Sequence, residues 1–324
     1  MTIVDSLAVP RFVGVPTFMR LPLTTLEGAA GADIAIFGIP SDSGAPYRTG
    51  ARFGPNAIRA QSVMLRPVNP YRGNVHVFET LQVVDAGDSA VVPGYQIETM
   101  SHIEQATSAL VENGCIPLGL GGDHSISLPE LRALAKRHGP MALVHFDAHT
   151  DTWDRYFDDL PYSAGTPFRR AVEEGLIDAG RSIQIGMRGS LFRTTDLTQS
   201  LDLGFDVVTT DEALNLGPPA LGRRIADRVG RTPAFISFDL DVVDPASAPG
   251  VQTPEAGGPS ARDVLTWLRA LPSLDLVGAD VVETNPLFDG PGQVTALLAA
   301  TVALEILALV ATERTSAGDR PRQR

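Results

Sequence analysis

The chain has 324 residues, of which 44% are hydrophobic and 20% charged, a composition that supplies a large core and excludes disordered and fibrous proteins. Its 26 basic and 38 acidic residues give a formal net charge of -12, so no electrostatic nucleic-acid partner is expected. The single cysteine, Cys115, excludes an internal disulfide and a cysteine-rich zinc site, and it fits a reducing cytoplasm.

Neither end of the chain predicts a targeting or membrane segment. The N-terminal stretch carries Asp5 and lacks a basic region followed by an apolar one, so it does not resemble a signal peptide. Residues 294–311 are almost wholly apolar and long enough to cross a membrane. Glu305 lies inside this segment, however, and small residues alternate with leucines at helical spacing, which favours a helix buried in a globular protein. We therefore expect no membrane partner and a cytoplasmic location.

Apolar runs without polar alternation recur along the chain, with helical stretches between them. This order is typical of an α/β protein whose mostly parallel sheet is covered on both faces. The predicted strands are 33–38, 116–120, 142–146, 182–185, 206–209, 234–238 and 276–282. The predicted helices are 100–112, 127–136, 167–174, 221–229, 261–271 and 293–312, with Ser127 and Ser260 as start signals.

The chain shows no sign of a division into two halves. No run of Gly, Ser or Pro separates two parts, and there is no internal repeat. We therefore predict a single domain over residues 1–314. Residues 315–324 are polar and contain Pro and Gly, so they are predicted to form a flexible tail.

The densest polar cluster follows the predicted strand 142–146. Asp147, His149 and Asp151 stand at every second position, and in an extended chain such side chains point the same way. They can therefore converge on one point. His145 lies inside the strand and is interpreted as a core histidine, or one that supports a ligand, rather than as a ligand itself.

Two further clusters follow other predicted strands. Asp239 and Asp241 repeat the alternate spacing after strand 234–238, and His124 follows strand 116–120. Ligands of α/β sheets gather at the carboxyl ends of strands, so all three clusters are expected to meet. The predicted metal ligands are His124, Asp147, His149, Asp151, Asp239 and Asp241. Asp123 and Asp244 are interpreted as turn acids, or as acids that support the ligands, rather than as ligands.

The charge of this predicted site points to metal. Four carboxylates within a few ångströms repel one another unless cations neutralise them. A bridging carboxylate would hold two ions about 3.5–4 Å apart. We assign one ion to His124, Asp147, Asp151 and Asp239, and the other to Asp147, His149, Asp239 and Asp241. An isolated Asp-x-Asp after a strand usually caps a loop or helix, so it is the coincidence of three clusters that favours metal over capping.

These motifs resemble the metal-binding signatures of the ureohydrolase (arginase/agmatinase) superfamily. The matching segments are GGDHS at 121–125, DAHTD at 147–151 and SFDLDVVDP at 237–245. The resemblance continues in PRFVGVPTFMRLP at 10–22, YRTGARFGP at 47–55, IGMRG at 185–189 and ETNP at 283–286. The N-terminal stretch and GTPFRRA at 165–171 are more similar to agmatinases, guanidinobutyrases and proclavaminate amidinohydrolases than to arginases.

The resemblance implies a three-layer α/β/α fold and a binuclear centre, with Mn²⁺ as the default and Ni²⁺, Co²⁺ or Fe²⁺ fitting the same ligands. It implies attack of a metal-generated hydroxide on a guanidinium carbon, releasing urea and an amine. Asp151 would hold the hydroxide, and Glu283 would pair with the substrate guanidinium. It also implies a homo-oligomer, a trimer or hexamer, with residues 1–30 at the interface.

The chain departs from the family at Ala164, where many relatives carry a histidine that moves protons. An altered substrate, a replacement by Tyr162 or water, an engineered alanine and a weakly active subunit of a mixed assembly are the alternatives. Trp153 would fill the space in which arginases read the head of arginine, so arginine is not expected. Trp153 and Arg188 are candidate substrate contacts, although Trp153 equally fits packing under a loop.

We therefore predict a metal-dependent hydrolase of a small-molecule guanidino compound. Agmatine, guanidinobutyrate and related guanidino compounds are the expected substrates, with guanidine or a biguanide as the alternative. Two other hypotheses remain, a structural partner of an active paralogue and a relative with different chemistry such as a deacetylase. The intact ligand set argues against the first, and His149 with Asp241 argues against the second.

Overall fold

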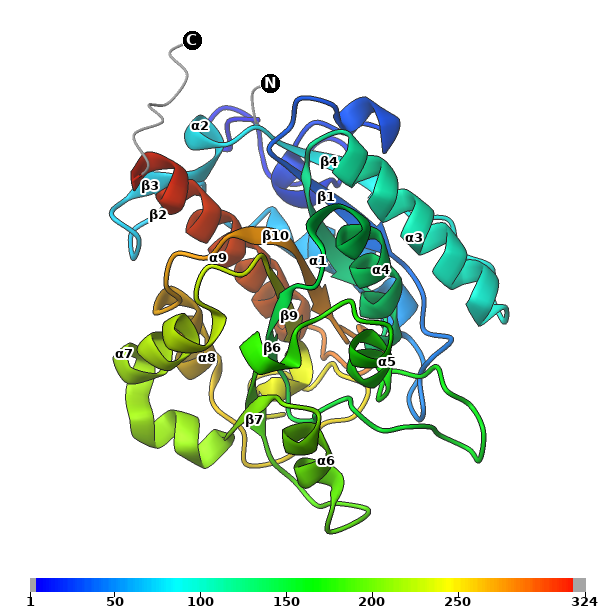
Figure 1. Ribbon diagram of the computed structural model, residues 1–324. Coiled ribbons are helices and arrows are strands. Elements are labelled where there is room, and N and C mark those ends of the chain that lie inside the picture. The colour runs from blue at the N-terminus through cyan, green and yellow to red at the C-terminus, as the bar shows by residue number, and fades with distance from the viewer. Residues whose placement is uncertain (1–3, 317–324) are drawn as a thin grey trace.

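The computed structural model describes residues 4–316 of the chain. Its centre is an eight-stranded sheet in which all paired neighbours run parallel (Figure 1). In spatial order the strands are β4 (Val83–Asp88), β1 (Ile34–Ile39), β5 (Ile116–Gly121), β10 (Leu276–Val282), β9 (Ala234–Asp239), β6 (Ala142–Phe146), β7 (Ile183–Met187) and β8 (Asp206–Thr209). A separate antiparallel pair consists of β2 (Val68–Asn69) and β3 (Val75–His76).

Helices cover both faces of the sheet (Figure 1). One layer contains α3 (Gln96–Glu112), α4 (Ser127–His138) and α5 (Pro167–Glu173). The other contains α1 (Gly54–Ser62), α7 (Thr210–Val229), α8 (Ala261–Arg269) and α9 (Val294–Ser316), while α2 (Val77–Thr80) packs on α9 and α6 (Asp196–Asp202) packs beside β8. Short 3-10 turns are η1 (Phe18–Arg20), η2 (Glu27–Ala29), η3 (Ala51–Phe53), η4 (His124–Ile126), η5 (Ala179–Arg181) and η6 (Leu240–Val242).

Alternate side chains of each strand enter the two halves of the core. In β1, Ile34 and Ile36 pack in the cluster that includes α9, whereas Ala35 and Phe37 pack with residues of α3. Strands buried on both faces need apolar residues on both sides, which explains their continuous apolar runs. The predicted α/β fold with a mostly parallel sheet in three layers is thereby confirmed.

All seven predicted strands lie in the sheet, with their ends shifted by at most two residues. The eighth, β4, was not predicted because its sequence, VVDAGD, mixes apolar, small and acidic residues. Its buried Asp85 accepts hydrogen bonds from Nε and Nη2 of Arg59 at 2.9 and 2.8 Å. A charge so paired can be buried in a strand, and a sequence pattern cannot show the pairing in advance.

The predicted helices are present, but the helix expected over 221–229 begins earlier, at Thr210 in α7. Thr209 caps that end, and Gly217, with a φ of 71°, kinks the helix before two prolines. Prolines inside a helix remove a donor, which is why the first part was not predicted. Helices α1, α2 and α6 were not predicted either. Of the expected tail 315–324, Thr315 and Ser316 belong to α9, and the remainder lies outside the described residues.

Helix α9 is long and apolar enough to cross a membrane, but 78% of its most apolar window is buried against the rest of the protein. Inside it, Glu305 is only 4% exposed. Its carboxylate accepts from Nδ2 of Asn69 and Nε of Arg269, both at 2.8 Å, and the Arg269 guanidinium stacks on Tyr71. These contacts confirm the predicted helix buried in a protein core.

Candidate metal centre

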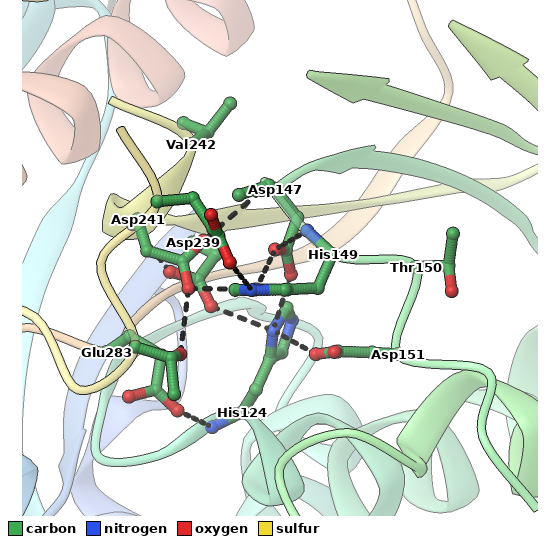
Figure 2. A network of polar contacts seen from close by, with 12 residues as sticks. His124, Asp147, His149, Thr150, Asp151, Asp239, Asp241, Val242 and Glu283 are labelled. Atoms are coloured by element: carbon green, nitrogen blue, oxygen red, sulfur yellow. Dashed lines mark hydrogen bonds and ion pairs between the residues drawn. The ribbon is translucent and has the colours of Figure 1, made fainter. Parts of the chain in front are cut away.

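The candidate site lies at the carboxyl ends of four strands that are neighbours at the centre of the sheet. His124 follows β5, Asp147 follows β6, Asp239 ends β9 and Glu283 follows β10. Parallel strands present their carboxyl ends at one edge, so segments far apart in sequence meet there. Figure 2 shows the side chains of all six predicted ligands turned toward a common centre.

One group of donor atoms surrounds His124. Its Nδ1 lies 3.1 Å from Oδ2 of Asp147, 2.9 Å from Oδ2 of Asp151 and 3.1 Å from Oδ2 of Asp239 (Figure 2). All four residues are buried, and Nδ1 makes no hydrogen bond of good geometry. Burial by itself lowers the pKa of His124, but the three carboxylates raise it well above its usual value. One imidazole nitrogen facing three carboxylate oxygens is a donor set that fits a divalent cation.

A second group surrounds His149. Its Nδ1 lies 3.3 Å from Oδ1 of Asp147 and 3.1 Å from Oδ2 of Asp241. Asp147 therefore presents one oxygen to each histidine, as a bridging ligand must. Oδ1 of Asp239 accepts the backbone N–H of Asp241 at 2.7 Å, which holds the two neighbouring acids in place. The structure thus brings the six predicted ligands together as two adjoining groups.

The site carries more acidic groups than its imidazoles can neutralise. Burial and neighbouring carboxylates raise the pKa of Asp151 to about 7 and also raise the pKa values of Asp239 and Asp241. In Asp147 burial acts in the same direction, but His145 and the other histidines outweigh it and lower the pKa. Two divalent cations would supply the missing positive charge. The residues present therefore fit a binuclear centre.

His145 contacts the ligand Asp147 from inside β6. Its Nε2 lies 2.8 Å from Oδ2 of Asp147, and its Nδ1 lies 3.0 Å from Nε2 of Gln184. Burial lowers the pKa of His145 to about 4, although the neighbouring Asp147 acts in the opposite direction. Both nitrogens are occupied, which agrees with the interpretation of His145 as a supporting histidine.

Glu283 offers an unused acceptor at the edge of the metal groups. Its Oε1 accepts the backbone N–H of His124 at 2.8 Å and Nε2 of Gln252 at 3.0 Å. Its Oε2 is buried and has no hydrogen-bond partner. Burial and the nearby Asp123 raise the pKa of Glu283 well above its usual value, so a cationic ligand is needed to stabilise its charge.

Two of the predicted residues have backbones in the left-handed region. The φ of Asp151 is 50° and that of Glu283 is 64°. Such conformations cost a side-chain-bearing residue about 1–3 kcal/mol and tend to occur at functional sites. The backbone N–H of Glu283 donates to the carbonyl of Gly122 at 2.8 Å, which helps to hold this conformation.

A cavity of about 560 Å³ opens above the metal groups. Its lining includes Glu283, an aromatic wall and four of the predicted ligands. The aromatic wall is formed by Trp153, Tyr156, Phe157 and Phe192, and the ligands are His149, Asp151, Asp239 and Asp241. The ring of Trp153 lies 6.4 Å from that of His149 and 5.5 Å from that of Tyr156. Trp153 is therefore part of the cavity wall and not only packing beneath a loop.

The remaining predicted positions lie as follows. Ala164 lines the cavity. Tyr162 does not line it and packs instead beside Arg132, whereas Tyr156 lines the cavity together with Ala164. Arg188 also lies outside the lining, where its guanidinium donates to the carbonyl oxygens of Val242 and Asp241, both at 2.8 Å.

Sequence reasoning missed three side chains that support the ligands. Ser237 lies 2.8 Å from Nε2 of His124, and the buried Asp280 accepts from Ser237. Gln184 contacts His145 and donates to the carbonyl of Thr150 at 2.6 Å. All three are polar residues inside otherwise apolar strands, and that isolated polarity was the available signal.

The chain matches a known protein family over most of its length. The model of the Arginase family matches residues 32–309. The chain belongs to the arginase family. Enzymes of this family depend on a binuclear metal centre, and the described residues hold two groups of side chains that could bind a metal ion, which are His124, His145, Asp147 and Asp151, and Asp147, His149 and Asp241. The predicted resemblance is thereby confirmed.

Arginase-family relatives match nearly the full length of the chain. A guanidinopropionase of Pseudomonas aeruginosa is 44% identical over 307 residues, which cover 95% of each chain. A guanidinobutyrase of the same species is 42% identical over 302 residues, covering 93% of this chain and 94% of that one. The solved structure of proclavaminate amidinohydrolase from Streptomyces clavuligerus is 41% identical, with a TM-score of 0.89, and the match covers 94% of this chain and 99% of that chain.

Proposed function

We propose that this protein is a metal-dependent hydrolase that cleaves a guanidino C–N bond and releases urea and an amine. The observation that carries the proposal is the unpartnered Oε2 of Glu283 beside the two metal groups. A buried carboxylate oxygen without a partner is costly unless a ligand donor meets it. A guanidinium matches a carboxylate with two parallel N–H donors, so it satisfies this oxygen and neutralises its charge.

The chain's own side chains perform the remaining tasks. When bound, two cations neutralise the acidic ligands and make a water molecule nucleophilic near neutral pH. Glu283 binds the guanidinium and fixes its plane against the metal groups. Oδ2 of Asp151 lies 2.9 Å from Nδ1 of His124. In our proposal this carboxylate holds a proton of the attacking water. Trp153 and its aromatic neighbours give one part of the cavity lining an apolar surface.

We propose a set of four ligands for each of two metal ions. His124, Asp147, Asp151 and Asp239 would hold one ion, and Asp147, His149, Asp239 and Asp241 the other. Mn²⁺ is the proposed metal, because carboxylates with imidazole suit it, while Ni²⁺, Co²⁺ and Fe²⁺ fit the same donors. Metal content after purification under metal-limited and metal-supplemented growth tests this assignment.

The proposed substrates are agmatine, guanidinobutyrate and related guanidino compounds rather than arginine. The relatives named guanidinopropionase and guanidinobutyrase support this choice. Trp153 occupies the cavity beside His149, where it narrows the space for an α-amino acid head. Arg188, held by backbone carbonyls, acts in our proposal by positioning the loop of Asp241 rather than by touching substrate.

The decisive test compares the wild type with Glu283→Gln. The metal-loaded wild type should release urea from a panel of guanidino compounds. The Gln variant keeps the shape but loses the charge that pairs with the guanidinium, so we expect about a 10²–10³-fold lower kcat/KM with metal content unchanged. Undiminished urea release by Glu283→Gln would exclude the proposed role of this carboxylate.

A second candidate is hydrolysis of guanidine itself or of a biguanide. Ala164 favours it, because the cavity wall carries no imidazole there to protonate a leaving amine, and the aromatic wall suits a compact planar cation. Guanidine and a biguanide therefore belong in the same panel. A weakly active subunit of a mixed assembly is the remaining alternative, and it is disfavoured by the complete ligand set and Glu283.

We propose a homo-oligomer in the cytoplasm, with the N-terminal segment 1–30 at the interface. Among the described residues of that segment, Leu7 is 98% exposed and Phe12 is 89% exposed. Apolar side chains so exposed are typical of an interface with another subunit. Light scattering after size-exclusion chromatography should give the mass of a trimer or hexamer. Deletion of residues 1–15 should shift the protein toward smaller assemblies.

A further inference from the structure

The cavity above the metal groups has an uneven distribution of charge. Its floor, next to the metal groups, carries Asp151, Asp239, Asp241 and Glu283. Among the described residues that line it, Arg48 is the one arginine or lysine. An acidic floor attracts the guanidinium of a substrate, but a fixed cation in the same cavity repels any second positive charge. Its presence calls for a ligand group of negative charge.

Arg48 has no anionic partner of its own within the described part of the chain. Its guanidinium lies 4.5 Å from the ring centre of Phe288 and 5.8 Å from that of Tyr47, and no carboxylate or carbonyl contacts it. Arg52, four residues further along the chain, differs because it pairs with Asp42. Stacking on an aromatic ring fixes the plane of Arg48 and leaves its N–H donors available to a ligand.

The loop that carries Arg48 is held on its N-terminal side by the floor of the site. The backbone N–H of Gly44 donates to Oδ2 of Asp123 at 2.7 Å, next to the metal-ligand candidate His124. The carbonyl of Gly44 accepts the N–H of Ala164 at 2.9 Å. These bonds tie the loop to two segments of the cavity wall.

The same loop is held on its C-terminal side by the segment of Glu283. Nδ2 of Asn285 donates to the carbonyl of Thr49 at 3.1 Å, and Phe288, on which Arg48 stacks, belongs to the same segment. Gly50 is required at this point, because its φ is 129° and an added Cβ would lie 2.4 Å from Oδ1 of Asn285. The loop that carries Arg48 and the segment that carries Glu283 are therefore held together by the fold before any ligand binds.

Glu255, another acidic residue of the cavity lining, does not neutralise the charge of Arg48. Its Oε1 lies 3.9 Å from Nε2 of His149. Its backbone carbonyl accepts from Arg188 at 2.7 Å. Glu255 is thus turned toward the histidine side of the cavity, and no ion pair joins it to Arg48.

We propose that Arg48 binds the carboxylate of the substrate, so that the enzyme selects guanidino acids over guanidino compounds with a neutral or amine-bearing tail. The inference rests on the proposed guanidino hydrolase function. Glu283 receives the guanidinium end and Arg48 the carboxylate end of one zwitterion. Because both residues sit on loops tied to each other, the length of the chain between the two ends is selected as well.

The test uses three substrates with nearly equal chains and different ends: 4-guanidinobutyrate, butylguanidine and agmatine. Urea release by the metal-loaded full-length protein gives kcat and KM for each, in the wild type, Arg48→Met and Arg48→Lys. Met preserves length and contact with Phe288 but removes the charge. Arg223→Met, on the exposed face of α7 and outside the cavity, is the matched control.

The wild type should prefer 4-guanidinobutyrate. Arg48→Met should lose about tenfold or more in kcat/KM on this acid, mainly through KM, because a charge-assisted hydrogen bond is removed. The ratio of kcat/KM on 4-guanidinobutyrate to kcat/KM on butylguanidine should fall in Arg48→Met. Arg48→Lys should retain part of the wild-type ratio, and Arg223→Met should match the wild type. A wild type that prefers agmatine or butylguanidine, or an equal loss on all three substrates in Arg48→Met, overturns the role of Arg48. No urea from any of the three, nor from guanidine or a biguanide, would overturn the proposed function as well.

Discussion

His124 and the buried Asp280 are joined through a single hydroxyl group. Nε2 of His124 lies 2.8 Å from Oγ of Ser237, which donates to Oδ1 of Asp280 at 2.6 Å. When Nδ1 faces a cation, Nε2 carries the hydrogen and donates to Ser237. This relay fixes the plane of the imidazole and makes its Nδ1 a better donor to metal.

Removing the relay should weaken metal binding. Ser237→Ala should lower metal affinity by about 10–100-fold, because Nε2 of His124 loses its acceptor. Competition with a chelator of known affinity measures the change. Ser127→Ala is the matched control, since Ser127 donates to Oδ2 of Asp280 at 2.5 Å but does not contact His124. Equal affinities in the wild type and Ser237→Ala would contradict the relay.

Metal removal should lower thermal stability. A ligand that binds only the folded state at 100 times its Kd adds about 2.7 kcal/mol, and in this site it also relieves the repulsion among buried carboxylates. Thermal unfolding with excess chelator should therefore give a lower Tm than with Mn²⁺. Asp147→Asn, which alters the carboxylate shared by His124 and His149, should abolish most of this difference. A wild-type Tm that does not respond to metal would exclude a site of this kind.

Ala164→His should change the pH dependence of urea release. Ala164 lines the cavity, so an imidazole there can exchange protons with a leaving amine. General acid–base catalysis is typically worth about 10²–10⁴-fold in rate. We expect a new pKa in the profile of kcat or a shift in substrate preference. Ala164→Gln, similar in size but not titratable, is the control, and a profile shared by all three proteins would exclude an acid–base role for this position.

The contact between Asp42 and Arg52 should stabilise the fold only above acidic pH. Burial alone would raise the pKa of Asp42, but hydrogen bonds from Arg52 and the N–H of Gly50 leave it lowered. A carboxyl group with a lowered pKa stabilises the folded state above its unfolded pKa of about 3.9, and the contribution is lost as pH falls through the folded value.

A double-mutant cycle measures this contribution. Asp42→Asn should reduce the free energy of unfolding by about 1–3 kcal/mol at pH 7, because a charge-assisted bond to a buried group is lost. The coupling energy with Arg52→Met, obtained from urea unfolding at pH values from about 7 down to about 3.5, should shrink toward the acidic end. A coupling energy that stays constant over this range would contradict a lowered pKa of Asp42 in the folded state.

Seven of the eight strands of the central sheet could be located from the sequence, and one could not. Continuous apolar runs located seven strands because doubly buried strands need apolar residues on both faces. β4 was missed because it contains the charged Asp85. This residue can be buried in a strand only because Arg59 donates hydrogen bonds to its carboxylate. A pattern along the sequence carries no information about a partner from a distant segment.

The candidate site shows the same division. The alternate spacing of Asp147, His149 and Asp151 indicated that their side chains converge, since extended chains repeat every second residue. The left-handed φ of Asp151 and Glu283, and the unpartnered Oε2 of Glu283, could not be derived in this way. They result from contacts between strand ends and loops.

The sequence by itself determined the composition of the site, its acidic excess and the strands from which its residues emerge, because these depend on local periodicity. Only the tertiary structure decided that Arg188 is turned to backbone carbonyls while Arg48 faces the cavity. Both arginines look alike in a sequence, and their roles differ because packing between distant loops determines which guanidinium is already satisfied.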